Sequence, residues 1–225
     1  VGVVRTDGSE RHAPAWLYLG STGIGDDRYV ARVDWAGDDV VVVQLQSRDQ
    51  RRLDVVRFDL ADRGGDIGVV PGRLLWSETS EVWINLHDVL RVLPDGSFLW
   101  ASERSGFRHL EVREPDGSLR HVLTEGPWVV TDVLGVGDRE VWFRSTDASP
   151  LERHVLRVPL DASRPAERVS RAPGVHAGAA HPDTGAWVDV HSTPDHPPRT
   201  TLRRAAGDED GTVLHDAGDD PRVGE

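Results

Sequence analysis

His87 and Asp88 close the segment SETSEVWINLHD (77–88), which places an imidazole beside a carboxylate after an apolar run and a tryptophan. Such a pair could be part of a catalytic apparatus, because imidazoles and carboxylates commonly move protons in active sites. Serine hydrolysis also needs a nucleophile on a sharp turn, commonly in a G-x-S-x-G motif. No serine of this sequence stands in that motif, and Ser105 in RSGF has only one glycine beside it. The sequence therefore supplies no self-sufficient active site.

The sequence also gives little support for a metal site. None of the ten histidines stands in an H-E-x-x-H motif. His191, Asp195 and His196 in HSTPDHPP could approach a metal as a loop cluster, but the neighbouring prolines are more typical of a rigid turn. The acidic run DEDG (208–211) lacks the alternating ligand order of a calcium loop and is typical of a solvated turn. Cysteine is absent, so we expect no metal site and no cofactor.

The charge balance restricts the partners. The 225 residues carry 26 basic and 38 acidic side chains, a formal net charge of −12, and every basic residue is an arginine. Nucleic acids and anionic membranes need clustered positive charge, so we expect neither as a partner. The longest apolar runs, such as DVVVVQL (39–45), have the length of a strand and not of a membrane span. Methionine is absent, so we expect an internal piece of a longer polypeptide or a processed one.

Short alternating or β-branched runs fill the chain, separated by turn sequences such as TDGS, LPDGS, EPDGS and HPDTG. The Asp-Gly steps tolerate the positive φ that tight hairpins require. No stretch keeps a 3.6-residue period beyond two turns, so the sequence predicts an all-β fold.

A repeat with four strands per unit organises these runs. Residues 91–126, 135–174 and 180–218 share one order of strands and turns, and residues 34–65 form a further copy followed by a glycine-bearing insertion (64–73). Aligning four arginines that precede apolar-bearing strands gives spacings of 56, 45 and 46 residues: Arg52, Arg108, Arg153 and Arg199. A period in the mid-forties is typical of β-propeller blades. We predict a partial β-propeller of about four four-stranded blades, preceded by a hairpin (1–20) from a fifth, and we expect the recurring arginines to be architectural.

The eight tryptophans fit this prediction as core residues. Trp35, Trp83, Trp128 and Trp142 fall at or near first and second strands of the repeats. Aromatic side chains at those places fill the wedge between blades, so we expect buried tryptophans and not a platform for stacking sugars or bases.

Six segments in fixed order carry a resemblance to a known family: RYVARVDWAGDD, LQSRDQRRLDVV, SETSEVWINLHD, ASERSGFRHLEV, TEGPWVVTDVLGV and STDASPLERHVLRV. Together they resemble the propeller domain of the dipeptidyl peptidase IV family, in particular bacterial dipeptidyl aminopeptidases and the dipeptidyl peptidase 8 and 9 branch. The resemblance covers residues 28–204, and WINLHD with GFRHL is its most specific pair.

The resemblance implies a larger protein. Members of this family join an eight-bladed propeller to an α/β-hydrolase domain and release N-terminal dipeptides, favouring proline or alanine in the second position. Their catalytic Ser, Asp and His belong to the hydrolase, which would follow residue 225, so we expect no catalytic residue in this chain. Their glutamate pair for the substrate amine has no Glu-Glu counterpart here, and we expect it before Val1. Residues 1–204 would then be the second half of the propeller, and residues 205–225 the acidic, Gly-rich end of the last blade and a linker.

Blade topology predicts which segments share a face. In an up-and-down blade, the loop between strands two and three emerges beside the connection to the next blade. SETSEVWINLHD reads as such a connection, and the expected loops are SRDQRR (47–52), SERSGFRH (102–109), STDASPLERH (145–154) and HSTPDHPP (191–198). The resemblance implies that part of residues 85–87 lines the substrate cavity.

The candidate substrate-binding residues are therefore Asn85, His87, Asp88 and Arg48. The plainer interpretation is structural. His87 and Asp88 would satisfy backbone groups at a strand entry, and Arg48 would form an ion pair with Asp49 or another carboxylate of this face.

Two functions remain open. The chain is either a non-catalytic propeller segment of a serine dipeptidyl aminopeptidase that releases Xaa-Pro or Xaa-Ala dipeptides, where it gates and lines the substrate cavity, or a stand-alone propeller that binds or scaffolds proteins. The first function implies a peptide substrate and a hydrolase domain of the same polypeptide as partners. Exposed strand edges of a cut propeller also favour self-association. We expect a cytoplasmic location, and we expect this segment alone not to be an enzyme.

Overall fold

The computed structural model describes residues 1–4, 15–21, 24–60, 69–206, 208 and 210–219. The tip of the predicted first hairpin (5–14), residues 64–68 of the predicted insertion and the end of the predicted linker (220–225) lie outside this part. Strands make up the described elements apart from two single-turn 3-10 helices, η1 (Leu19–Ser21) and η2 (Ala217–Asp219). No helix among the described residues is long and apolar enough to cross a membrane.

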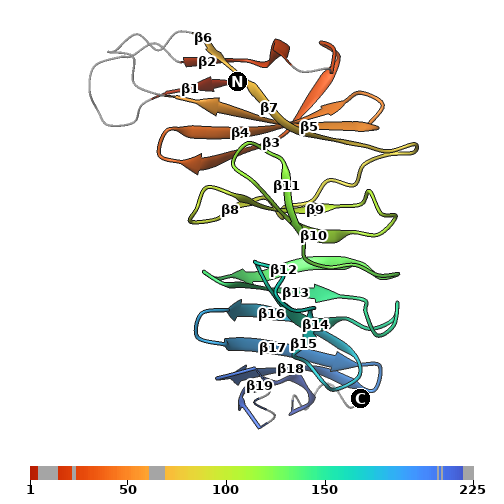
Figure 1. The fold of residues 1–225 in the computed structure, drawn as a ribbon. Coiled ribbons are helices and arrows are strands. Elements are labelled where there is room, and N and C mark those ends of the chain that lie inside the picture. The colour runs from red at the N-terminus through yellow and green to blue at the C-terminus, as the bar shows by residue number, and fades with distance from the viewer. Residues whose placement is uncertain (5–14, 22–23, 61–68, 207, 209, 220–225) are drawn as a thin grey trace. The chain divides into compact units, whose positions relative to one another are not determined.

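The described strands form four sheets of four strands and one of three (Figure 1). The three-stranded sheet has the order β1-β2-β6, with β1 (Gly2–Val3), β2 (Ala15–Tyr18) and β6 (Val69–Pro71). The next has the order β3-β4-β5-β7, with β3 (Arg28–Gly37), β4 (Val40–Ser47), β5 (Arg52–Asp59) and β7 (Arg73–Thr79). The next comprises β8 (Arg91–Val92), β9 (Phe98–Ser102), β10 (His109–Arg113) and β11 (Leu119–Val122) in the order β11-β10-β9-β8.

The last two sheets follow the same up-and-down order. One is β12-β13-β14-β15, with β12 (Val130–Val136), β13 (Glu140–Ser145), β14 (His154–Pro159) and β15 (Glu167–Arg168). The other is β16-β17-β18-β19, with β16 (Val175–His181), β17 (Ala186–Thr193), β18 (His196–Arg203) and β19 (Thr212–Asp216). The prediction of about four four-stranded blades is confirmed, although the frame of the predicted repeats was wrong. The first strands β12 and β16 begin before residues 135 and 180, because a Gly- and Asp-containing turn gives a stronger sequence signal than the strand that precedes it.

The Asp-Gly turns form as predicted. In the turn between β10 and β11, Asp116 Oδ1 accepts from the backbone N–H of Ser118 at 2.9 Å and from its hydroxyl at 2.7 Å. Gly117 takes a φ of +93°, and a Cβ atom there would meet the Leu75 carbonyl oxygen at 2.3 Å. Only glycine satisfies both the backbone conformation and the space.

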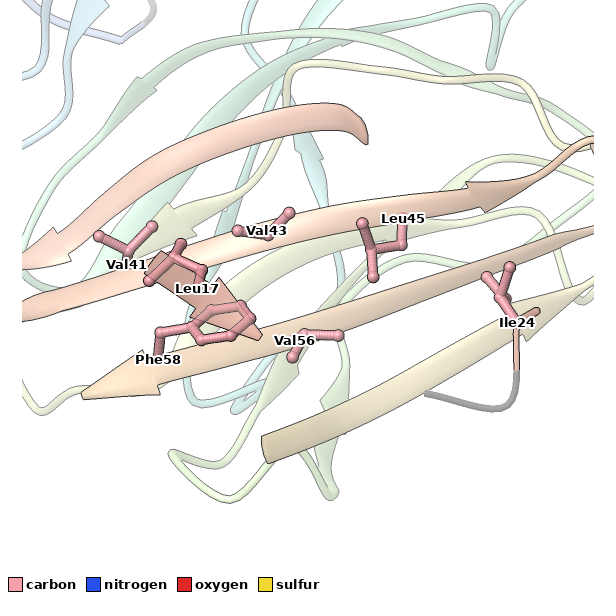
Figure 2. Close-up of a cluster of buried hydrophobic side chains, with 7 residues drawn as sticks. All are labelled: Leu17, Ile24, Val41, Val43, Leu45, Val56 and Phe58. Atoms are coloured by element: carbon pink, nitrogen blue, oxygen red, sulfur yellow. The ribbon is translucent and has the colours of Figure 1, made fainter. Parts of the chain in front are cut away.

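The chain divides into two compact units, residues 1–98 with 114–118 and residues 99–113 with 119–225. The first unit has a core formed on one face of its sheet, where alternate residues of β4 lie beside those of the neighbouring strand β5. Its buried side chains are Leu17, Ile24, Val41, Val43, Leu45, Val56 and Phe58 (Figure 2). Each such side chain stabilises the fold by roughly 1.5–3 kcal/mol through its removal from water.

The second unit has a core around two tryptophans. Trp142 and Trp187 are buried together with Val155 and Val169, and their indole rings lie 6.1 Å apart in a tilted arrangement. Trp142 therefore fills the core as predicted. Trp128 is half-buried and stacks on Phe143 at 6.3 Å.

The same prediction was wrong for two tryptophans of the first unit. The exposed fractions are 62% for Trp35 and 59% for Trp83. Trp35 lies on β3, which pairs only with β4 and forms one edge of its sheet. Trp83 lies in the connection after β7, where the backbone is held and the side chain turns outward. The hydrophobicity of tryptophan alone therefore did not predict that these two side chains are exposed.

Candidate functional site

The loop at residues 48–51, between β4 and β5, is built around the Asp49 carboxylate. Its Oδ1 accepts from the Ser47 hydroxyl at 2.6 Å and from the Arg51 backbone N–H at 3.1 Å. These hydrogen bonds hold the pKa of Asp49 below its usual range, with the Ser47 hydroxyl as the larger cause. Gln50 has a φ of 61° and donates its N–H to the Ser47 carbonyl at 2.9 Å. The loop is therefore fixed by its own hydrogen bonds.

The connection between β7 and β8, residues 80–90, docks on this β4–β5 hairpin. Four hydrogen bonds join them: the Ser80 N–H to the Arg51 carbonyl (2.9 Å), the Ile84 N–H to the Gln50 carbonyl (2.8 Å), Arg51 Nε to the Val82 carbonyl (3.2 Å) and Gln46 Nε2 to the Ile84 carbonyl (3.2 Å). The predicted face shared by these two segments is confirmed. We call the loop 48–51 together with residues 80–90 the rim.

The predicted site residues of the connection have local partners. Asn85 Oδ1 accepts from the Trp83 indole N–H at 3.1 Å. His87 Nδ1 accepts from the Val89 backbone N–H at 3.3 Å, just before β8 begins. The structural interpretation of His87 is thus confirmed, and its contact with a substrate stays a prediction.

Asp88 is held by an arginine of β3. Arg32 Nε donates to Asp88 Oδ1 at 2.7 Å, and the Asp88 side chain is largely exposed. The hydrogen bond from Arg32 and its positive charge hold the pKa of Asp88 below its usual range. Arg91 donates to the Asp88 carbonyl at 2.7 Å, so the backbone of this residue is fixed as well.

Arg48 lies at the rim with a partner that the sequence did not indicate. Its Nε lies 3.9 Å from Asp27 Oδ1, and its guanidinium carbon lies 4.7 Å from the centre of the Tyr29 ring. Asp49 is engaged within its own loop, so of the two predicted alternatives the ion pair with Asp49 was wrong and the ion pair with another carboxylate of this face is confirmed. The guanidinium is mostly exposed at this position.

In the second unit, a histidine holds the connection between β11 and β12. His109 is buried, with Nε2 at 2.9 Å from the Gly126 carbonyl and Nδ1 at 3.1 Å from Thr124 Oγ1. Since a carbonyl only accepts, Nε2 donates, and Nδ1 accepts from the hydroxyl. Thr124 Oγ1 in turn accepts from the Leu110 N–H at 2.9 Å. The ring and the hydroxyl are both fully engaged.

The next sheet repeats this arrangement with a carboxylate. His154 Nδ1 lies 3.0 Å from Ser170 Oγ, and His154 Nε2 lies 3.1 Å from Glu152 Oε2. The hydrogen bond with His154 holds the pKa of Glu152 below its usual range. Serine, histidine and glutamate in this order resemble a catalytic triad. Ser170 is however buried, and its Oγ accepts from the Val155 N–H at 2.9 Å, as Thr124 does from Leu110. The arrangement is architectural.

A buried charged network follows in the last sheet. His176 Nε2 lies 2.9 Å from the Ala172 carbonyl, and Nδ1 lies 2.8 Å from Asp189 Oδ1. The backbone carbonyl only accepts, so Nε2 donates to it, and Nδ1 faces the Asp189 carboxylate. Arg203 Nε donates to the other Asp189 oxygen at 3.1 Å. These groups line a cavity of about 220 Å³ together with Trp187.

His109, His154 and His176 were not among the residues predicted for a site. The signal was present as RH followed by an apolar residue at two third strands, RHL and RHV, each with a threonine or serine 15 or 16 residues after the histidine.

The two histidines that were weighed as part of a metal cluster have other partners. His191 Nε2 donates to the Pro173 carbonyl and His196 Nδ1 to the Pro197 carbonyl, each at 2.9 Å. In the described part of the chain, no three His, Cys, Asp or Glu side chains are placed to hold a metal ion. The predicted loop at 191–198 does join strands two and three of its sheet, but its length was wrong, because β17 ends at Thr193 and β18 begins at His196.

The recurring arginines all have local partners. These are Asp54 for Arg52 (2.8 Å), Glu103 for Arg108 (2.9 Å), the Pro150 carbonyl for Arg153 (2.8 Å) and Asp216 for Arg199 (2.6 Å). Their predicted architectural role is confirmed. Arg199 lies inside β18 and Arg52 is the first residue of β5, so only Arg108 and Arg153 stand just before a strand as predicted.

Four-stranded up-and-down sheets that follow one another along the chain are the blades of a partial β-propeller. A family model for the dipeptidyl peptidase IV (DPP IV) N-terminal region matches residues 1–198. The chain belongs to this family.

Curated proteins agree with this family assignment, and a solved structure agrees with the fold. Probable dipeptidyl-aminopeptidase B of Coccidioides posadasii is 34% identical over 151 residues, and dipeptidyl-aminopeptidase B of Aspergillus niger is 31% identical over 149; each match covers 61% of this chain and 16% of the relative. The crystal structure of Porphyromonas gingivalis dipeptidyl peptidase 4 has a TM-score of 0.75 and 20% identity, and the match covers 87% of this chain and 27% of that one. The chain thus spans about a sixth of the length of these curated relatives.

We predict that the Arg32–Asp88 ion pair contributes a pH-dependent increment of stability. Because the folded pKa of Asp88 is lowered, this increment is present above the usual carboxylate range near 3.8 and is lost as the pH falls through the folded pKa. Asp88→Asn should reduce the free energy of unfolding in urea at pH 7 by less than about 1 kcal/mol, because both side chains are partly exposed. The difference from the wild type should disappear at a pH below the folded pKa. Glu81→Gln, on the same connection, is the control, and an Asp88→Asn effect that is independent of pH would contradict the assignment.

We also predict that the Thr124 hydroxyl is required by two buried groups at once. Thr124→Val should lower the free energy of unfolding by roughly 1–3 kcal/mol, because it leaves the Leu110 N–H and His109 Nδ1 without a partner. Thr124→Ser should restore most of the loss. Thr184→Val, at an exposed hydroxyl, should change stability by less than about 0.5 kcal/mol. Equal effects of the two valine variants in urea unfolding would show that the hydrogen bonds of the Thr124 hydroxyl contribute no particular stability.

Proposed function

We propose that this chain is a non-catalytic propeller segment of a serine dipeptidyl aminopeptidase. In that enzyme it would line and gate the cavity that admits peptides with proline or alanine in the second position. The observation that carries the proposal is the family match over residues 1–198, together with relatives whose names describe dipeptidyl peptidases. The partners we propose are the peptide substrate and a hydrolase domain of the same polypeptide, and the proposed location is the cytoplasm.

The rim supports a role in binding and not in chemistry. His87 Nδ1 accepts from the Val89 N–H and Asp88 accepts from Arg32, so the backbone and an ion pair hold the two side chains. A rigid segment that presents Asn85 and His87 can orient a substrate while the bond is broken by groups elsewhere. Arg48 would add an exposed positive charge that can pair with a carbonyl or carboxylate.

The gene distinguishes this function from a stand-alone binding or scaffolding propeller. A G-x-S-x-G motif between a strand and a helix, followed by Asp and His, would support the peptidase. A stop codon or an unrelated domain directly after residue 225 would contradict it and favour the scaffold.

The kinetic test uses the complete polypeptide encoded by the gene and a chromogenic Xaa-Pro amide. His87→Ala should raise KM about 3–10-fold and change kcat less than about 2-fold, because a contact made equally in the ground state and the transition state affects KM alone. His181→Ala, at an exposed histidine of β16, should leave both constants unchanged. An unchanged KM for His87→Ala would refute the contact, and turnover by the 225-residue chain alone would refute its non-catalytic role.

We further propose that the isolated chain associates with itself through exposed strand edges. The edge strand β3 exposes Val33 and Trp35, and the edge strand β19 exposes Val213 and Leu214. Apolar side chains along an unpaired edge favour pairing between copies. Light scattering of the 225-residue chain should give a mass above 24.8 kDa that falls on dilution, and a monomer at all concentrations would count against the idea.

A further inference from the structure

The residue that precedes the candidate site has both of its backbone polar groups bound to the β4–β5 hairpin. Ile84 donates its N–H to the Gln50 carbonyl at 2.8 Å, and its carbonyl accepts from Gln46 Nε2 at 3.2 Å. Asn85 follows at once, and His87 two residues later. The hairpin therefore fixes the chain where the candidate site begins.

Gln50 holds its carbonyl in place through an unusual backbone conformation. Its φ of 61° lies in the left-handed region, which residues other than glycine rarely adopt. The hydrogen bonds of Asp49 with Ser47 and Arg51 close the turn around it. Strained residues persist where the surroundings determine them and where the strain places a group for a task. Here the group is the acceptor for Ile84.

Gln46 is buried, and a neighbour on the same strand shows that burial alone does not explain it. Gln44 lies two residues earlier on β4, hence on the same face of the strand, and is equally buried. Its Oε1 has no hydrogen-bond partner, whereas the Gln46 amide donates to the connection. The two glutamines differ in what they touch, which provides a matched comparison.

We propose that Gln46 and Gln50 are positioning residues that set Asn85 and His87 for substrate binding. The proposal rests on the proposed function above and adds the groups that act through the backbone of Ile84. Neither glutamine contacts the substrate. Gln46 fixes the Ile84 carbonyl, Gln50 fixes the Ile84 N–H, and together they hold residues 85–87 in one orientation before the substrate arrives.

The experiment compares Gln46→Leu with Gln44→Leu. Hydrogen exchange at the Ile84 amide of the 225-residue chain should become at least about 10-fold faster in Gln46→Leu, because the segment opens more often. In the complete polypeptide, KM for the Xaa-Pro amide should rise about 10-fold while kcat changes less than about 3-fold, since the lost contribution is to binding. Gln44→Leu should leave the exchange rate and both kinetic constants as in the wild type.

A second pair of variants keeps the proposal testable if Gln46→Leu fails to fold. Gln50→Gly accepts the positive φ and keeps the carbonyl in place, so KM should stay within about 2-fold of the wild type. Gln50→Val disfavours that φ, and it should reproduce the fast Ile84 exchange and the raised KM. If the glycine and valine variants behave alike, the positioning role of Gln50 is wrong.

The outcomes separate this inference from the proposed function. If His87→Ala raises KM but Gln46→Leu changes neither exchange nor KM, the positioning role is overturned and the substrate-binding function stands. If Gln46→Leu speeds exchange and His87→Ala leaves KM unchanged, the hairpin does fix the segment but the segment does not bind substrate. That result overturns the functional part of the proposal. Fast exchange together with a raised KM supports both.

Discussion

A connection that leaves one sheet and enters the next has no strand partner, yet its backbone N–H and C=O groups must still find hydrogen bonds where water is excluded. In this chain the hairpin between strands two and three provides them. The carbonyl of the residue before the third strand accepts from the connection in the first unit, Arg51 from Ser80. In the second unit it accepts from the start of the next first strand, Arg108 from Val130 and Arg153 from His176. The rim depends on this arrangement, because residues 80–90 lie outside the strands and the hairpin fixes them without a ladder.

Side chains complete the same task with different chemistry in each sheet. Gln46 donates to the Ile84 carbonyl, His109 to the Gly126 carbonyl and His176 to the Ala172 carbonyl. What the fold requires is a buried N–H donor at the right depth, and a side-chain amide or an imidazole can each supply it. A buried histidine in this chain is therefore evidence about architecture before it is evidence about catalysis.

The strands and turns were predictable because their signals are local. Alternation marks a strand, and an Asp-Gly step marks a turn whose backbone needs a positive φ, as at Gly117. The pairing of the rim segments also followed from topology. The sequence did not predict the partner of Arg48, the exposure of Trp35 or the hydrogen bonds of the buried histidines. Each of these depends on which segments far apart in the sequence lie together. Residue types alone do not indicate which segments meet. Arg48 pairs with Asp27, whereas Asp49 is hydrogen-bonded within its own loop.

The candidate site also shows how the protein matrix limits the chemistry of one side chain. His87 Nδ1 accepts the Val89 N–H, so a neutral His87 carries its proton on Nε2. Any contact made through Nε2 is then one in which His87 donates, to a carbonyl or a carboxylate. A donor suits the carbonyl groups of a peptide and cannot serve as the base for a nucleophile. The backbone of a strand entry thus decides which ring nitrogen of a neutral His87 carries the proton.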